Sequence, residues 1–150
     1  MVTFQKEDFM QVFSEATELL RGHYEEVAER QDVIPLDPDV ARYQKMFDMD
    51  MLEIHTARED GNLIGYSAWF VCTNMHYKTS LTASSDVIYI SPEHRKGMVG
   101  ARFIKWTTQE IKKRNPQRIL FHVKPSVDFG PILERLGANY LEKIYSLVLE

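Results

Sequence analysis

Apolar residues recur at helical spacing through the first part of the chain, after a brief alternation at its start. Residues 2–5 predict a short first strand, and the apolar positions between residues 8 and about 30 predict an amphipathic helix. Gly22 lies inside this pattern, where glycine costs about 1 kcal/mol relative to alanine. The pattern therefore leaves open whether one helix forms or two shorter helices separated at Gly22.

Residues 34–36 interrupt the helical pattern, and a second helix is expected beyond them. Asp37 offers a capping acceptor, and Pro38 supplies a proline at the first helical position. The apolar stripe that follows reaches Phe47, so we expect this helix to end near that residue.

The middle of the chain changes to runs of β-branched and aromatic residues, which are typical of strands. Three strands are predicted, at residues 52–59, 63–73 and 81–90. The first two flank the pair Asp60-Gly61, which tolerates the positive φ of a tight hairpin. We therefore expect these two strands to pair antiparallel.

Helical spacing returns at Val99 and is expected to end before Pro116, which forbids its continuation. A short strand at residues 119–124, a short helix at 129–136 and a last strand at 140–149 complete the pattern.

The order of these elements predicts a single α/β domain over residues 1–150, a mixed sheet with helices on both faces. Residues 81–124 form a strand, a helix and a strand, so we expect a right-handed parallel crossover there. Ligands of open α/β sheets favour the carboxyl ends of the strands. The turn after Ile90 is therefore where chemistry is expected first.

Composition limits location and partners. The chain has one cysteine, which excludes an internal disulfide. Its net charge of -4 disfavours nonspecific electrostatic binding to nucleic acid. Charged residues occupy the start of the chain where a signal peptide needs an apolar run, and no stretch approaches the roughly 18 apolar residues of a membrane span. The histidines lack metal-ligand spacing, and Cys72 has no partner for a zinc site. We expect a cytoplasmic protein with no metal and no membrane partner.

The turn between residues 90 and 98 combines features of an anion-binding site. Free N–H groups at a helix N-terminus, together with the helix dipole, favour negative charge. Gly97 and Gly100 allow a phosphate to approach the backbone, and Arg95 and Lys96 add positive charge. The same residues are also typical of a solvated turn, so both interpretations stay open on local chemistry alone.

The strand, the turn that contains Arg95, and the helix after Gly100 resemble the acetyl-coenzyme A motif of the GNAT family of N-acetyltransferases. The order of elements resembles that family over nearly the full chain, including a Leu-Gly turn at Leu136-Gly137 before the last strand. The Arg-Lys-Gly-Met-Val-Gly form of the turn is similar to GNAT-like proteins encoded by bacteriophages. The resemblance implies a GNAT-like acyl-CoA N-acyltransferase fold.

The resemblance also implies that acetyl from acetyl-coenzyme A passes to a primary amine by direct attack in a ternary complex. The residues it assigns to the cofactor are Ile88, Ile90, Arg95, Lys96, Gly97, Met98, Val99, Gly100, Ala101 and Ser126. Backbone amides of residues 98–101 and the Arg95 side chain would hold the pyrophosphate. Backbone groups of Ile88 and Ile90 would pair with the pantetheine arm, and the Ile90 N–H would stabilise the thioester oxyanion.

An amine attacks only when it is neutral, so acyl transfer needs a group that accepts its proton. Asp86 is the nearest carboxylate on the motif strand, and alternation places it on the face of Ser84 and Ile88. Glu93 and His76 are the alternatives. A solvent-facing acid and an exposed histidine are the simpler interpretations of Asp86 and His76.

The region that shapes the acceptor pocket in this family is acidic and rich in methionine here. Between residues 37 and 60, acids outnumber bases by seven to three, which favours a cationic acceptor. Met46, Met49 and Met51 are typical of plain packing, although methionine also adapts to an irregular groove.

Two positions depart from the family pattern. Met98 stands where the signature has glycine, and Leu133 stands where many members have the tyrosine that protonates the thiolate. These departures leave open a second function, a GNAT-like protein without turnover that binds a protein partner. A free-standing phosphate- or nucleotide-binding module is a third. The sequence also leaves a monomer and a homodimer both open.

Overall fold

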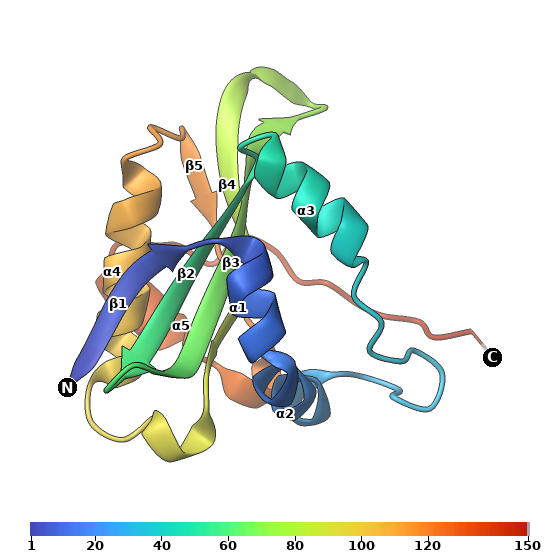
Figure 1. Cartoon of the computed structure of the whole chain (residues 1–150). Helices are drawn as coiled ribbons and strands as arrows, with labels where there is room; N and C mark the ends of the chain where they lie inside the picture. The colour runs from blue at the N-terminus through green and yellow to red at the C-terminus, as the bar shows by residue number, and fades with distance from the viewer. Residues whose placement is uncertain (150) are drawn as a thin grey trace.

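The computed structural model describes residues 1–149 and contains one five-stranded sheet with helices on both faces (Figure 1). The elements in chain order are β1 (Val2–Glu7), α1 (Phe9–Glu15), α2 (Thr17–Val27), α3 (Val40–Asp48), β2 (Leu52–Glu59), β3 (Asn62–Asn74), β4 (Tyr77–Ile90), α4 (Val99–Lys112), β5 (Arg118–Leu120) and α5 (Gly130–Arg135). Two short 3₁₀ helices, Pro92–His94 and Pro125–Val127, precede α4 and α5. This α/β architecture confirms the predicted fold class.

The strand order is β1-β2-β3-β4-β5. The first four strands pair antiparallel, and the β2–β3 hairpin turns at Asp60-Gly61 as predicted. β4 and β5 pair parallel, which confirms the crossover through α4.

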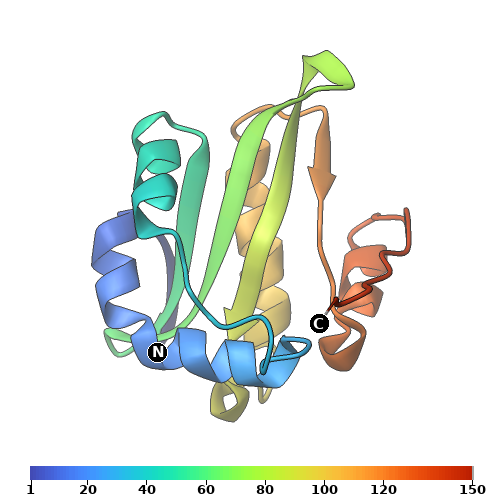
Figure 2. The same cartoon turned by 90° about the vertical axis from the view of Figure 1, so that its right-hand side faces the viewer.

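The helices form a layer on each face of the sheet. Figure 2 shows α1, α2 and α3 on one side, α4 on the other, and α5 beside β5 at the end of the sheet. Phe9, Ile54 and Tyr66 belong to the core under α1, whereas Phe103 and Ile111 attach α4 to the opposite face. Each face of the sheet therefore has its own apolar core.

The first helical region is broken at Ala16 and not at Gly22. The Ala16 N–H bonds to the carbonyls of Val12 and Phe13, at 2.9 and 3.3 Å, which closes α1 before α2 begins. Gly22 lies inside α2, facing Tyr89, whose hydroxyl would lie 3.4 Å from an added Cβ. The lack of a side chain at Gly22 therefore lets α2 pack closely against Tyr89 of the sheet. Gly22 does not mark a break in the helix.

The second helix begins two residues later than the Asp37-Pro38 pair predicts. Asp39 is its cap, and the Asp39 carboxylate accepts a hydrogen bond of 3.0 Å from the Arg42 N–H. That N–H belongs to the first turn and has no acceptor within the helix, so the capping bond satisfies it. Asp37 remains in the connection between α2 and α3.

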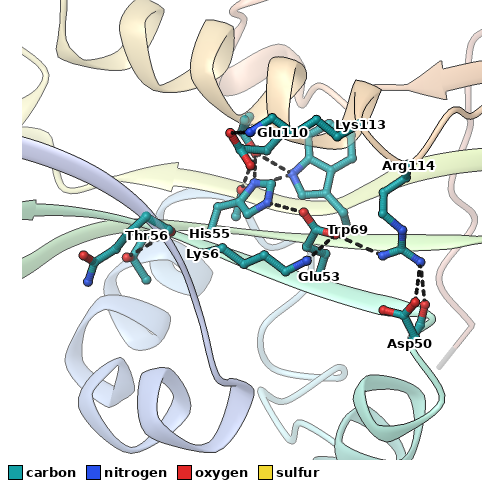
Figure 3. A network of polar contacts seen from close by, with 12 residues as sticks. Lys6, Asp50, Glu53, His55, Thr56, Trp69, Glu110, Lys113 and Arg114 are labelled. Atoms are coloured by element: carbon teal, nitrogen blue, oxygen red, sulfur yellow. Dashed lines mark hydrogen bonds and ion pairs between the residues drawn. The ribbon is translucent and has the colours of Figure 1, made fainter.

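A buried polar network fixes α4 to the sheet (Figure 3). Thr107 of α4 contacts the His55 Nδ1, and the His55 Nε2 lies 2.8 Å from a carboxylate oxygen of Glu53. The other Glu53 oxygen accepts from Lys6 and from Arg114, each at 3.0 Å. Because His55 and Glu53 are almost fully buried, these contacts replace the water that the polar groups would otherwise bind. The network therefore sets the position of α4 relative to β2.

The prediction of a last strand at residues 140–149 is wrong. Residues 138–149 form no helix or strand, and their large apolar side chains are exposed, Tyr145 and Leu147 at 86% each. β5 is also shorter than the predicted 119–124, because its pairing ends at Leu120. An alternation of apolar and polar residues indicates that one side of a segment can be buried. A strand also needs a neighbouring strand to pair with, and β5 offers an edge of only three residues.

Candidate functional site

A bulge in β4 places Asp86 toward α3. Ala68 pairs with Val87 while the next β3 residue, Trp69, pairs with Ser85, so Asp86 is an extra residue in β4. Val87 packs with the core under α1, whereas Ile88 packs under α4. Simple alternation predicts that Asp86 and Ile88 share a face of the sheet, and this prediction is wrong. The bulge shifts the alternation by one residue, so the two side chains lie on opposite faces.

β4 and β5 separate just before this point. Their pairing ends at Ser84 and Leu120, and the last contacts between the two segments join His122 to Ser85, with the His122 Nδ1 2.7 Å from the Ser85 carbonyl. β4 continues to Ile90 beyond that point. Among residues 1–149, the end of β4 therefore has β3 on one side and no paired strand on the other, and we call this unpaired edge of β4 the gap.

The backbone of Ile88 and Ile90 faces this gap. The Ser91 N–H bonds to the Ile64 carbonyl at 2.9 Å, and antiparallel pairing alternates residues that bond to the neighbour with residues that point away. Tyr89 therefore bonds toward β3, and the polar groups of Ile88 and Ile90 point away from it. The Ile90 carbonyl accepts a 2.8 Å hydrogen bond from the Arg95 Nε.

The turn before α4 presents a helix N-terminus beside the end of β4. Gly97 has φ +70°, a left-handed conformation that favours glycine, and it directs the chain into α4. The first bond inside α4 runs from the Arg102 N–H to the Met98 carbonyl, at 2.8 Å. The N–H groups of residues 99–101 therefore have no acceptor within the helix. An added Cβ at Gly100 would meet nothing within 4 Å, so the first turn of α4 is open on the side of Gly100.

The Arg95 side chain lies toward α2 and not in front of α4. Its guanidinium bonds to both Glu26 carboxylate oxygens, at 2.6 and 2.8 Å, and lies 5.4 Å from the centre of the Tyr89 ring. The hydrogen bond and charge of Arg95 lower the pKa of Glu26, and Glu26 raises that of Arg95. Lys96 is exposed on the turn, and Ser126 is exposed in the 3₁₀ helix after β5.

A pocket of about 380 Å³ opens on the face of the sheet opposite α4. Its walls come from α1, α2, α3, the connection from α2 to α3, and strands β2, β3 and β4, with Lys124 after β5. Apolar and aromatic side chains make up most of the lining, and its polar side chains include His23, Asp37, Asp86 and Lys124. Ser67 also lines the pocket, but its hydroxyl lies on the α4 side, 3.1 Å from the Thr107 hydroxyl. Because Asp86 lies where β4 parts from β5, one end of the pocket reaches the gap.

Tyr43 holds the Asp86 carboxylate. Its hydroxyl donates a hydrogen bond of 2.5 Å to Asp86. Burial raises the pKa of Tyr43, and the hydrogen bond to Asp86 raises it further, so the hydroxyl stays protonated and donating.

His23 of α2 lies at the same pocket, between two tyrosines. Its ring stacks on Tyr89 at 4.6 Å between centroids, and its Nδ1 lies 3.3 Å from the Tyr66 hydroxyl. Burial lowers the pKa of His23, so the imidazole is neutral at pH 7.

The other two candidate bases lie elsewhere. His76 is exposed in the turn between β3 and β4, at the opposite end of β4 from Ile90 (Figure 1). Glu93 is exposed in the turn before α4, 3.8 Å from the His94 ring. The structure therefore brings Asp86, Ile88, Ile90 and residues 98–101 to one end of β4, and leaves His76 outside this group.

Sequence reasoning missed the partners that come from the N-terminal helices. Tyr43, His23 and Glu26 stand on α2 and α3, far from the motif in sequence, and each fits an ordinary amphipathic pattern. An acid or a tyrosine at helical spacing carries no local signal that it faces a pocket. Their role follows only from the packing of these helices on β4.

Within residues 1–149, no group of three or more histidine, cysteine or acidic residues is arranged to hold a metal ion. None of the helices in the same range combines the length and the apolar character needed to cross a membrane.

Neither a protein-family model nor a curated protein matches the sequence. Solved structures match the fold over the whole chain. A ribosomal-protein-alanine N-acetyltransferase from Brucella melitensis biovar Abortus 2308 is 18% identical with TM-score 0.71, and each chain is covered to 100%. A predicted acetyltransferase from Clostridium acetobutylicum, solved with acetyl-CoA, is 18% identical with TM-score 0.74, covering 99% of this chain and 96% of that one.

An aminoglycoside acetyltransferase from an uncultured soil metagenomic sample, in complex with sisomicin, is 12% identical with TM-score 0.72. That match covers 99% of this chain and 97% of the other. These likenesses extend over all the elements that form the gap, the helix terminus and the pocket. The protein has the fold of the GNAT N-acetyltransferases.

Proposed function

We propose that this protein is an N-acetyltransferase that moves the acetyl group of acetyl-coenzyme A to a primary amine by direct attack in a ternary complex. The observation that carries the proposal is the gap beside the end of β4, with the N-terminus of α4 at one end and the Asp86 pocket on the other face. A thioester in the gap would meet an amine that enters from the pocket. Neither the gap nor the pocket alone would favour this reaction.

The proposed cofactor contacts are mainly backbone groups. The N–H groups of residues 98–101 would bind the pyrophosphate, with Lys96 as a nearby exposed cation and Ser126 as a hydroxyl donor. Ile88 and Ile90 would hydrogen-bond the pantetheine amides, and the Ile90 N–H would stabilise the negative charge that develops on the thioester oxygen. Arg95 would reach a phosphate only by leaving Glu26, so in the conformation described it supports the turn instead.

Asp86 is the group proposed to bind the amine and accept its proton. Its carboxylate would bind the ammonium and then accept a proton, directly or through water, to leave the neutral nucleophile. The lone pair of the amine would attack the thioester carbon, and the carbon–sulfur bond would break to release coenzyme A. Tyr43 would keep the carboxylate aimed at the gap through its hydrogen bond.

Thermal unfolding with acetyl-coenzyme A tests the cofactor half of this proposal. Ligand at about 100 times Kd adds about 2.7 kcal/mol, which raises Tm by several degrees. Gly100→Trp should abolish the shift by filling the space in front of α4, and Gly100→Ala should keep most of it, because a Cβ there meets nothing within 4 Å. ATP and inorganic phosphate serve as controls for a simple phosphate-binding module. A larger rise in Tm with ATP than with acetyl-coenzyme A at the same concentration would contradict the proposal.

A second candidate function is a protein with this fold that binds a partner without turnover. Leu133, in place of the usual acid tyrosine, is buried at 6% exposure, and Met98 is exposed at the N-terminus of α4. This candidate predicts no thiol release with any amine, even when acetyl-coenzyme A binds. Thiol release that depends on Asp86 would exclude it.

A further inference from the structure

The pocket beside Asp86 is built for an apolar body with one positive charge. We infer that the acceptor is a primary monoamine whose amino group is carried on an aryl or alkyl group by a short chain. This inference rests on the proposed function for the chemistry of the amine, but the selectivity of the pocket can be measured without turnover.

The walls favour an apolar body. Phe9, Phe13, Leu20 and Tyr43 line it from the helices, and Tyr66 lines it from the sheet. The rings of Phe9 and Tyr43 stack with centroids 5.5 Å apart, so this wall is already packed and ordered. Hydroxyl-rich amines would lose hydrogen bonds to water against such side chains without replacing them, which weakens binding.

The charges of the pocket fit a single ammonium group near the gap. Asp86 is the carboxylate on β4, and Asp37 stands on the connection between α2 and α3. Lys124 lines the pocket as well and repels a second cation. A polyamine would therefore bury its further charges against apolar groups or bring them near Lys124, and both cost binding energy.

The connection from α2 to α3 limits the length of the acceptor. The Tyr24 hydroxyl donates a hydrogen bond of 2.6 Å to the Ile34 carbonyl and lies 3.3 Å from the Gln31 carbonyl, which ties the connection to α2. Pro35 and Leu36, which follow, line the pocket. At about 380 Å³ the pocket falls in the lower part of the range for small-molecule sites, roughly 300–1,000 Å³.

Calorimetric titration of the full chain with 2-phenylethylamine, without acetyl-coenzyme A, tests the inference. We expect 2-phenylethylamine to bind at least about tenfold more tightly than spermidine, sisomicin or the uncharged 2-phenylethanol. Ala28→Phe should weaken its binding about tenfold, because Ala28 lines the pocket and has an extended backbone that accepts any side chain. Ala41→Phe, on the exposed side of α3 and outside the pocket lining, is the matched control and should leave binding unchanged.

Asp86→Asn separates charge from shape. It should reduce the affinity for 2-phenylethylamine about tenfold, to near that of 2-phenylethanol, whose own affinity should not change. Equal or tighter binding of spermidine or sisomicin, or indifference to both Ala28→Phe and Asp86→Asn, would overturn the inference.

Thiol release with the same amines then distinguishes the two proposals. Selective binding of 2-phenylethylamine without thiol release supports the pocket inference and counts against the acetyltransferase proposal. Acetylation of polyamines with no preference for 2-phenylethylamine supports the acetyltransferase proposal and overturns the pocket inference.

Discussion

Arg95 joins the turn before α4 to helix α2 through two hydrogen bonds to Glu26, at 2.6 and 2.8 Å. The same guanidinium donates to the carbonyl of Ile90, whose N–H faces the gap beside β4. One side chain therefore connects α2, which lines the pocket beside Asp86, with the end of β4, the strand proposed to hold the thioester. The pair fixes the distance between the two halves of the candidate site.

Glu26→Gln should destabilise the protein by about 1 kcal/mol at pH 7, because both side chains of the pair keep part of their contact with water. Arg95 lowers the pKa of Glu26, so the folded state prefers the ionised carboxylate. The contribution is fully present above the ordinary pKa of 4.5 and is lost as pH falls through the lower folded value. Urea unfolding of both proteins at neutral and acidic pH measures it.

Glu25→Gln is the control for this experiment, since Glu25 is an exposed acid on the same helix. It should leave the unfolding midpoint nearly unchanged. A stability difference between the original chain and Glu26→Gln that grows as the pH falls would contradict the assigned sign.

Tyr43→Phe should raise the KM for the amine about tenfold and lower kcat less, because Asp86 loses the donor that aims it. Tyr43 is a positioning residue, so binding of acetyl-coenzyme A should not change. Steady-state thiol release with varied amine measures the split. Tyr140→Phe, at a 71% exposed tyrosine, is the control, and an unchanged KM in Tyr43→Phe would show that the contact with Asp86 has no part in amine binding.

The glycine-containing turn and the helix N-terminus that follows it could be predicted from sequence because their parts are local. Gly97, Gly100 and the start of α4 lie within a few residues of Ile90, and helix N-termini act through backbone groups that every sequence has. The direction of the Arg95 side chain was not predictable in the same way. Its partner Glu26 is 69 residues away, and a choice between phosphate and carboxylate depends on how α2 packs.

The pocket and the chain end were also beyond prediction from sequence. Periodicity reports which side of a segment is apolar, but the bulge at Asp86 changes the face of every later residue in β4, and a bulge has no clear sequence signal here. Residues 140–149 show the opposite failure. Their apolar pattern is typical of a strand, yet no pairing forms in residues 138–149.

Gly65→Ala should destabilise the protein by about 2 kcal/mol and weaken binding of acetyl-coenzyme A. An added Cβ at Gly65 would lie 2.5 Å from the Tyr89 carbonyl oxygen and 3.1 Å from the Ile90 Cα. These are backbone atoms, so β4 itself must move, and the Ile90 N–H moves with it. Thermal unfolding with and without acetyl-coenzyme A measures both effects.

Gly100→Ala is the matched control for Gly65→Ala, because its Cβ meets nothing within 4 Å. It should keep or slightly raise Tm, as alanine favours helix over glycine by roughly 0.5–1 kcal/mol. If Gly65→Ala keeps both its Tm and its affinity for acetyl-coenzyme A, the close approach of β3 to Ile90 has no bearing on the gap.

Glu53→Gln should cost about 3 kcal/mol of stability at pH 7, because it leaves Lys6, Arg114 and His55 without the charge that pairs them in a buried site. Burial alone would raise the pKa of Glu53. The hydrogen bonds from His55, Lys6 and Arg114 outweigh burial and lower that pKa to about 2. Urea unfolding across the acidic range measures the consequence for stability.

The pH dependence of this loss has a definite sign. A carboxylate whose pKa falls from 4.5 to about 2 on folding stabilises the protein fully above pH 4.5, and this contribution disappears as the pH falls toward 2. The difference between the original chain and Glu53→Gln should therefore shrink with acidification, whereas the exposed Glu134→Gln should show little difference at any pH. Since the network holds α4 against β2, Glu53→Gln should also weaken binding of acetyl-coenzyme A at pH 7 (Figure 3). A variant that loses stability but binds acetyl-coenzyme A unchanged would mean that the position of the α4 N-terminus is set by apolar contacts alone.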